Sequence, residues 1–164
     1  MAPLVVLLGI AAALNGLLAG ASLDQSIEQL PARHRIGVRR YLDFTHAAHM
    51  ANGRFWLIPL GIFGPLATIL AAISGALLGL PAGRALPLYV AAVLSVAHMA
   101  STRIAGGINW QLAPWTPGHE RFAEDEVALA GVFARFERWQ AVRAGLQFLT
   151  FAISLWALVA ATGA

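Results

Sequence analysis

The feature that most constrains the fold is a set of four long apolar stretches separated by polar segments. They cover residues 3–23, 55–80, 86–102 and 144–161. About 20 consecutive apolar residues let a helix cross the hydrocarbon core of a bilayer. Only 12% of the residues are charged, against about 25% in a typical soluble domain. We therefore predict an all-α, integral membrane, up-down four-helix bundle that forms one domain over residues 1–164.

The first apolar stretch has two interpretations. It could be a signal peptide with its cleavage site at Ala19-Gly20-Ala21. The Met-Ala-Pro start offers no positively charged region, so we expect a membrane helix instead. Gly16 and Gly20 form a Gly-x-x-x-Gly motif, and Gly75 and Gly79 offer a second small-residue face. Such faces let helices approach closely, which would also suit a homo-oligomer.

The segments between the apolar stretches are expected to hold interfacial structure. After the first span we predict a short interfacial helix over residues 23–30, a break at Pro31 and a new helix from near Ile36. Pro59 and Pro65 should kink the second span near its start. Residues 103–126 are expected to form a loop with re-entrant or interfacial pieces. From Val127 an amphipathic, basic helix should continue without a break into the last span.

The distribution of arginine predicts the orientation in the membrane. All eleven positively charged side chains are Arg, and ten of them lie in or beside the first and third loops. Because cytoplasmic loops are enriched in positive charge, we expect four spans of a bacterial-type inner membrane with both termini outside. These arginines adjoin apolar spans, so we expect them to contact the lipid bilayer and no nucleic acid. The absence of Cys excludes disulfides, thiolate metal sites, iron–sulfur clusters and cysteine nucleophiles.

Polar side chains recur at one depth of the four spans. They are Asn15, Ser22, Asp24, Asp43, His46, His49, Asn52, His98, Thr102, Arg103, Arg138, Gln140, Arg143 and Gln147. Hydrocarbon offers no hydrogen bonds, so such groups turn inward or reach the interface. We therefore predict a polar cavity in the cytoplasmic half of the bundle.

Three histidines are candidates for chemistry in this cavity. His46 and His49 stand three apart and would share a face of an α-helix, and His98 could meet them from the third span. Together with Asp24 or Asp43 they could bind Zn, Cu or non-haem Fe. A bis-histidine haem is a further alternative. These histidines could also have no catalytic or binding role. His98 would then be a hydrogen-bonded imidazole in the core, and His46 and His49 would be solvated imidazoles at the membrane interface.

The remaining candidates would bind a substrate or balance charge. Arg143 and Gln147 are four residues apart and point the same way on the last helix. Either Arg143 or Arg103 could hold an anionic oxygen, unless they extend to lipid headgroups. The candidate catalytic residues are His46, His49, His98, Asp24 and Arg143, and the candidate substrate-binding residues are Asn15, Asn52, Trp56, Arg103 and Gln147.

Three short stretches resemble a known family. Ser22-Leu-Asp-Gln25, Asn52-Gly53 and Phe136-Glu-Arg-Trp-Gln-Ala-Val-Arg143 are similar to the anthrone oxygenase-like group of small four-helix membrane proteins. The resemblance covers the whole chain in layout and these stretches in residues. It implies oxidation of a flat polycyclic phenol by dioxygen in an apolar cavity with a base and without a bound cofactor.

The sequence thus leaves several functions open. The first hypothesis is a membrane oxidoreductase of the oxygenase type, with a histidine as general base and an arginine that stabilises the oxyanion. Its cofactor is either absent or a metal ion held by histidines. The second is a non-enzymatic accessory or assembly subunit. A metal-binding membrane protein or a carrier is the third.

Overall fold

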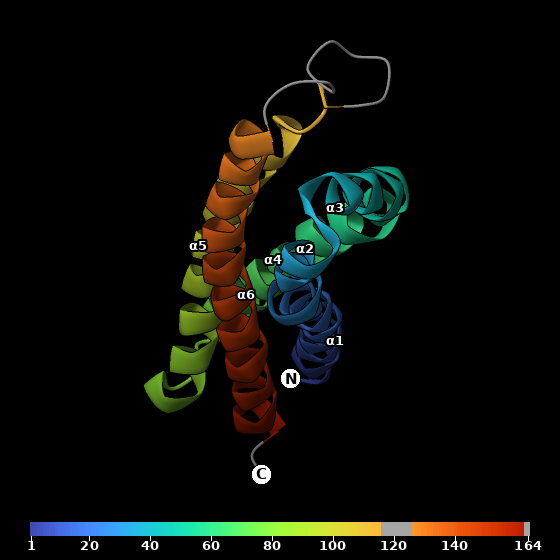
Figure 1. Cartoon of the computed structure of the whole chain (residues 1–164). Coiled ribbons are helices and arrows are strands. Elements are labelled where there is room, and N and C mark those ends of the chain that lie inside the picture. The colour runs from blue at the N-terminus through green and yellow to red at the C-terminus, as the bar shows by residue number, and fades with distance from the viewer. Residues whose placement is uncertain (116–125, 163–164) are drawn as a thin grey trace.

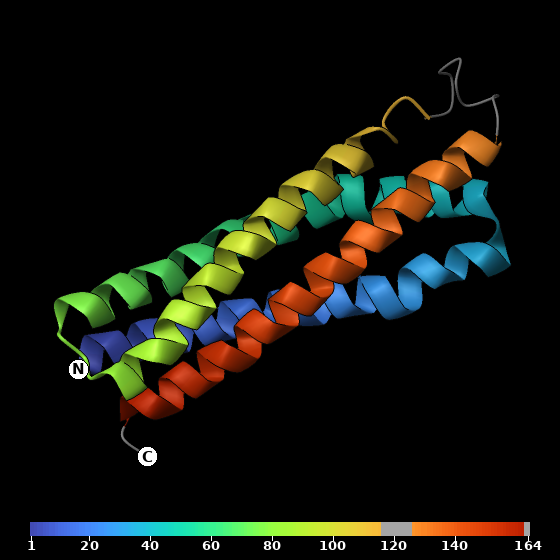
Figure 2. The same cartoon turned by 90° about the vertical axis from the view of Figure 1, so that its left-hand side faces the viewer.

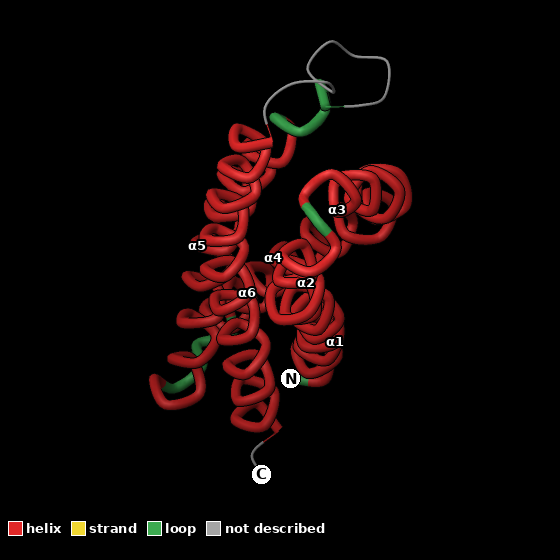
Figure 3. The backbone as a smooth tube through the Cα atoms, viewed as in Figure 1, coloured by secondary structure: helices red, strands yellow, loops and turns green. Residues whose placement is uncertain are grey.

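The computed structural model describes residues 1–115 and 126–162 of the chain. These residues form helices throughout, with short turns between them and no strand in the described ranges (Figures 1 and 3). The elements are α1 Ala2–Asp24, π-helical η1 Gln25–Gln29, α2 Leu30–Ile36, α3 Val38–Thr45, π-helical η2 His46–Gly53, α4 Arg54–Leu77, α5 Ala82–Trp110 and α6 Glu126–Thr162.

Four of the helical segments are long and apolar enough to cross a membrane. They begin at Ala2, Val38, Ala82 and Glu126. Their outer faces carry large exposed apolar side chains, among them Val6, Leu17, Ile62, Phe63, Leu70, Val93, Val96 and Leu155. A soluble protein rarely exposes so much apolar surface, whereas in a bilayer lipid covers it. The prediction of an all-α four-helix membrane bundle is confirmed.

The four long helices pack as an up-down bundle. α1 lies beside α4 and α6, and α5 lies beside the same two helices, so α1 and α5 are diagonal partners. The start of α1, the end of α6 and the turn between α4 and α5 lie at one end of the bundle (Figure 2). Gly79 turns the chain there with a φ of 62°, which favours glycine. The hairpin of α2 and α3 lies at the other end, on the side away from α5 (Figure 1).

Two apolar clusters fill the two ends of the bundle. Leu4, Leu8, Ala71, Ala72, Leu88, Ala157 and Ala161 form one cluster, near the termini. The other contains Leu30, Tyr41, Leu42, Ala105, Leu112, Trp115, Leu129, Val132, Phe133 and Phe136. Buried polar side chains lie between them, including Asn15, Thr68, His98 and Gln147. A polar section of the bundle interior therefore separates the two apolar clusters.

The predicted break at Pro31 is wrong, because the helix continues to Ile36 and ends at Gly37. In the π-helical turn η1 just before Pro31, the Leu30 N–H bonds to the Gln25 carbonyl, five residues back. Proline lacks an N–H and its ring clashes with an earlier carbonyl in a regular α-helix. The wider turn gives this ring room. The reversal falls instead on Gly37, whose φ of 86° suits glycine.

The predicted loop over residues 103–126 is also wrong in its first part, because α5 extends to Trp110. Gly106 and Gly107 lower the intrinsic helix propensity there. The helix persists because Ala105 and Leu112 are buried against α6 in the second cluster. Residues 116–125 of the predicted loop lie outside the described part of the chain. The prediction that the basic extension and the last span form one helix is confirmed by α6.

Candidate functional site

A pocket of about 210 Å³ lies where α1 and η1 meet η2, α4 and α6. It is lined by Ala21, Ser22, Asp24, Gln25, Gln29, His49, Gly53, Trp56, Leu57 and Arg143. Its volume is below the roughly 300–1,000 Å³ of most ligand pockets. It therefore suits a small molecule or one end of a larger apolar one. Trp56, which is 74% exposed, stands at its edge.

A chain of hydrogen bonds crosses the wall of this pocket. Arg143 Nη2 donates to Gln25 Oε1 at 2.9 Å, and Gln25 Nε2 lies 3.4 Å from His49 Nε2. Arginine has no acceptor, so the Gln25 oxygen must face Arg143 and its NH₂ group must face His49. The His49 Nε2 atom is then an acceptor, and the proton of the neutral imidazole sits on Nδ1. The contact of 3.4 Å is long, so a ligand hydroxyl could replace it.

A carboxylate and an incompletely paired cation share the pocket. Gln29 donates a hydrogen bond to the Asp24 carboxylate, which is exposed. The Arg143 Nε atom is buried and has no hydrogen-bond partner among the described residues. The pocket thus offers an acceptor nitrogen, a carboxylate and a guanidinium N–H over a few helical turns. Such a set can take a proton from a ligand and hold the oxygen left behind.

The two π-helical segments place these side chains. η1 carries Gln25 and Gln29, and η2 carries His49 and Gly53. π-helical turns are rare and are often found at functional sites. Gly53 allows close packing, because a Cβ added there would lie 3.1 Å from the Ala48 carbonyl oxygen. Both π-helical segments therefore contribute residues to the lining of the pocket.

Four of the ten candidate residues line this pocket, namely Asp24, His49, Trp56 and Arg143. Asn15 and Gln147 instead form a buried network in the bundle interior. Asn15 Nδ2 donates to Thr68 Oγ1 at 2.8 Å, and Gln147 Nε2 donates to the side-chain and backbone oxygens of Asn15 at 3.0 and 3.2 Å. These bonds tie α1 to α4 and α6, so the structure gives these two residues a packing role.

The other four candidates do not line the pocket. Asn52 and Arg103 are exposed, and His46 is partly buried, with no partner for its Nε2 atom in the described ranges. His98 is 1% exposed on α5, and its Nε2 lies 3.2 Å from Thr102 Oγ1. They belong to different parts of the bundle, so the predicted cavity gathers fewer spans than expected.

The predicted metal site at His46, His49 and His98 is not found. Within the described ranges, no group of three His, Cys, Asp or Glu side chains is placed to hold a metal ion. One reason is the π-helical form of η2, which holds more residues per turn than an α-helix. Residues three apart then diverge, so His46 and His49 no longer share one face.

Gln25 and Gln29 are functional candidates that sequence reasoning missed. Gln25 is buried and bridges Arg143 to His49, and Gln29 bonds to Asp24. A signal was present in the sequence. Ser22, Gln25 and Gln29 follow each other at spacings of three and four residues, which continues one polar face beyond the apolar stretch.

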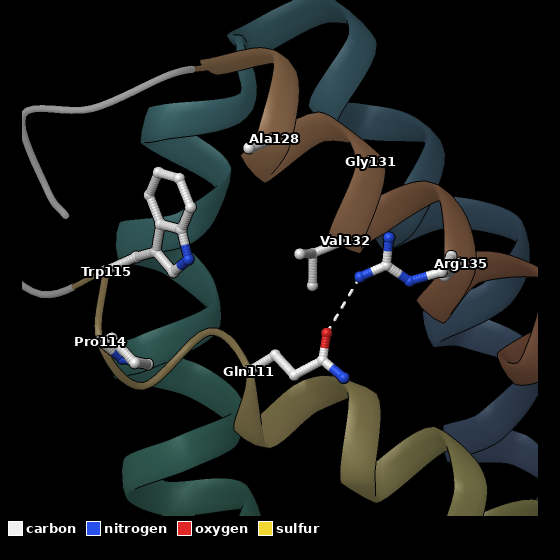
Figure 4. A pocket seen from close by; sticks show the side chains of 7 residues that line it. All are labelled: Gln111, Pro114, Trp115, Ala128, Gly131, Val132 and Arg135. Carbon is white, nitrogen blue, oxygen red and sulfur yellow. Dashed lines mark hydrogen bonds between the residues drawn. The ribbon is translucent and has the colours of Figure 1, made fainter.

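A larger hollow of about 620 Å³ lies between the end of α5 and the start of α6. Its lining is Gln111, Pro114, Trp115, Ala128, Gly131, Val132 and Arg135 (Figure 4). Arg135 Nη2 donates to Gln111 Oε1 across it at 2.9 Å. None of the ten candidate residues is in this lining, whereas four of them line the smaller pocket. We therefore assign the candidate site to the smaller pocket.

Comparisons with known proteins identify no relative, because no family model, no curated protein and no solved structure matches the chain. The function is therefore argued from the pocket.

Proposed function

We propose that the chain is a small membrane oxidoreductase of the oxygenase type that acts on a hydrophobic phenolic or polycyclic substrate. One observation supports this most: the acceptor nitrogen of His49 and the guanidinium of Arg143 line one pocket in a bundle of apolar helices. Apolar helices facing lipid make a bilayer-dissolved substrate the natural ligand. The resemblance of three short stretches to the anthrone oxygenase-like group agrees with this class.

In this proposal His49 acts as the general base. A substrate hydroxyl, or a C–H group made acidic by flanking aromatic rings, takes the place of the Gln25 amide beside His49 Nε2. It then gives up its proton to this nitrogen. The resulting anion is electron-rich enough to react with dioxygen directly. A methylene becomes a carbonyl, and the second oxygen atom leaves as water. No bound cofactor is needed for this balance.

Arg143 stabilises the substrate oxyanion in this proposal. Its guanidinium lines the pocket, where an N–H group can donate to a substrate oxygen. Asp24 balances the charge of Arg143 and of a protonated His49. Gln25 is the positioning residue, since it holds both partners through one amide group.

We further propose that the pocket lies in the cytoplasmic half of a bacterial-type inner membrane. The end of the bundle near the pocket carries Arg35, Arg40, Arg54, Arg103 and Arg138 as exposed side chains, whereas Arg84 lies in the first turn of α5 at the other end. Positive charge favours the cytoplasmic side. Both termini then face outside.

A second candidate is a non-enzymatic accessory or assembly subunit. The observation that favours it is the Asn15, Thr68 and Gln147 network, in which polar side chains of three helices bond directly to one another. Gly9, Gly20 and Gly61 have open space where a side chain would stand, so another helix could approach these faces. The pocket beside His49 is the feature that this candidate leaves unexplained.

The deciding experiment is dioxygen uptake by the purified chain in lipid nanodiscs with hydrophobic phenols and anthrones. Loss of the general base in His49→Gln is expected to lower the rate by about 10²–10⁴-fold. Loss of the oxyanion donor in Arg143→Gln is expected to cost about 10²–10³-fold. The matched control is His46→Gln, three residues away and outside the pocket, which should keep the wild-type rate.

Two outcomes would count against the proposal. If His49→Gln and Arg143→Gln both keep wild-type turnover, the mechanism is wrong. If the wild-type chain takes up no dioxygen and binds none of these compounds, the accessory role is the better account.

A further inference from the structure

Four buried polar side chains in the bundle interior each have an atom without a partner. The atoms are Ser95 Oγ, His98 Nδ1, Gln140 Oε1 and Gln147 Oε1, none of which bonds to a group in the described part of the chain. All four residues are at most 1% exposed. Buried polar groups are almost always hydrogen-bonded, and unpaired ones in an apolar core are costly. A set of four therefore points to a ligand.

The helix spacing brings three of these side chains to a similar level, and Gln140 lies two turns from Gln147 on the same face of α6. Ser95 and His98 are three apart on α5, and Gln140 and Gln147 are two turns apart on α6, so each pair shares a face. The two helices are antiparallel neighbours. Leu88 shares one buried cluster with Ala157, and Ala105 shares the other with Phe133. Midway between these contacts, Ser95 and His98 of α5 are level with the part of α6 that contains Arg143 and Gln147.

The glutamine amides show where the unpaired oxygens point. Gln140 Nε2 donates to the Ser22 carbonyl at 3.1 Å, and Gln147 Nε2 donates to Asn15. Both nitrogens therefore face α1. The oxygen lies on the other side of a planar amide, so both oxygens face away from α1 and, being buried, into the bundle.

The chemistry of the four atoms selects the ligand. Two are carbonyl acceptors, the Ser95 hydroxyl both donates and accepts, and the His98 nitrogen does one or the other. An anion would be repelled by the carbonyl oxygens, and a cation by Arg143, which lies between the two glutamines in sequence. A neutral molecule that donates and accepts fits best, and buried water typically makes about three such bonds.

We infer that the interior between α5 and α6, at His98 and Gln147, is a binding site for ordered water. The site adjoins the pocket through Arg143, whose buried Nε also has no partner within residues 1–115 and 126–162. Water there links the enclosed His98 to the pocket by hydrogen bonds. This inference does not depend on the oxygenase proposal, because it concerns hydration in the bundle and not turnover.

The test is water-to-protein polarisation transfer in solid-state NMR of the full chain in lipid bilayers. Side-chain signals of His98 and Ser95 are expected to build up several times faster than those of Ser154. Ser154 is the matched control, since it is equally buried but its hydroxyl donates to the Thr150 carbonyl at 2.7 Å. Build-up at His98 and Ser95 that is no faster than at Ser154 would overturn the inference.

Thermal unfolding of Ser95→Ala gives an independent readout. In a hydrated site the substitution removes a water partner, so the midpoint should fall. In a dry interior it removes an unpaired polar group, and the midpoint should rise. An unchanged or raised midpoint counts against the water site. Ser154→Ala shows the effect of losing a buried hydroxyl that already bonds to its own helix.

Discussion

Replacing Asn15 with leucine should weaken the bundle by a small, calculable amount. Asn15 is fully buried and joins three helices through Thr68 of α4 and Gln147 of α6. Leucine has a similar shape but no hydrogen-bonding atoms, so Asn15→Leu removes two bonds between helices. Neither partner is left unpaired. Thr68 Oγ1 still donates to the Gly64 carbonyl at 2.9 Å, and Gln147 Nε2 still donates to the Asn15 backbone oxygen at 3.2 Å.

The expected loss follows from these contacts. Hydrogen bonds between membrane helices contribute about 0.6 kcal/mol each on average and about 1.7 kcal/mol at most. Two such bonds give a free energy of unfolding lower by about 1.2 kcal/mol, with an upper bound near 3.4 kcal/mol. Because an added Cβ at Gly64 would lie only 3.1 Å from Asn15 Oδ1, the site is tightly packed, and a small steric cost adds to this loss.

The assay is reversible unfolding in mixed micelles, followed by circular dichroism as the denaturing detergent fraction rises. Asn52→Leu is the control, since Asn52 is an exposed asparagine. A double-mutant cycle with Thr68→Val should give a coupling energy of about 0.6 kcal/mol. An unchanged midpoint for Asn15→Leu, or no coupling to Thr68, would refute the network.

Three further predictions concern other contacts. Gly16→Ala should destabilise the bundle by about 1–3 kcal/mol through overpacking, because the added Cβ would lie 2.8 Å from Phe151 Cε2. Gly20→Ala is the control and should not destabilise the bundle, because Gly20 has open space around it. The unfolding midpoints of the two variants test this difference. Nitrogen-15 NMR should show His49 protonated on Nδ1 and not on Nε2. In Gln25→Leu both tautomers of His49 should be present. An Nε2–H signal from His49 in the wild-type protein would contradict the chain of hydrogen bonds from Arg143 through Gln25 to His49. The hydrogen bond from Arg33 lowers the pKa of Glu137, which lies before the apolar stretch of α6, so the stability from this pair should be present at neutral pH and lost as the pH falls below the ordinary carboxyl value of 4.5. The unfolding midpoints of wild type and Glu137→Gln should therefore converge in acid, and a gap that persists there would count against the assignment.

The long helices were predictable because hydrocarbon leaves a chain few options. Every backbone group must be bonded within the span, so 20 apolar residues specify a helix. The ends were harder to predict. Pro31 looked like a break, but the π-helical turn η1 accommodates its ring. Gly106 and Gly107 looked like a loop, but burial of Ala105 and Leu112 against α6 holds the helix together.

The sequence predicts the depth of the candidate residues in the membrane, but it does not predict which side chains bond to one another. The sequence indicated that Asp24, His49 and Arg143 lie at a similar height, and the structure places all three on one pocket. The prediction for the histidine pair rests on the assumption of a regular helix with 100° per residue. The π-helical η2 breaks that assumption, which separates His46 from His49. Side-chain amides such as Gln25 carry no charge signal, so their bridging role emerges only when three helices are packed.

The central claim is that η1, η2 and α6 bring Gln25, His49 and Arg143 to one pocket. The chain contains no cysteine, so introduced thiols can be crosslinked without background. In His49→Cys/Arg143→Cys a short thiol-specific crosslinker is expected to join the two positions, as detected by mass spectrometry of the digested protein. In His49→Cys/Arg103→Cys, where Arg103 is exposed on α5 and outside the pocket, little product is expected. Equal crosslinking in both pairs, or none in the first, would contradict the account.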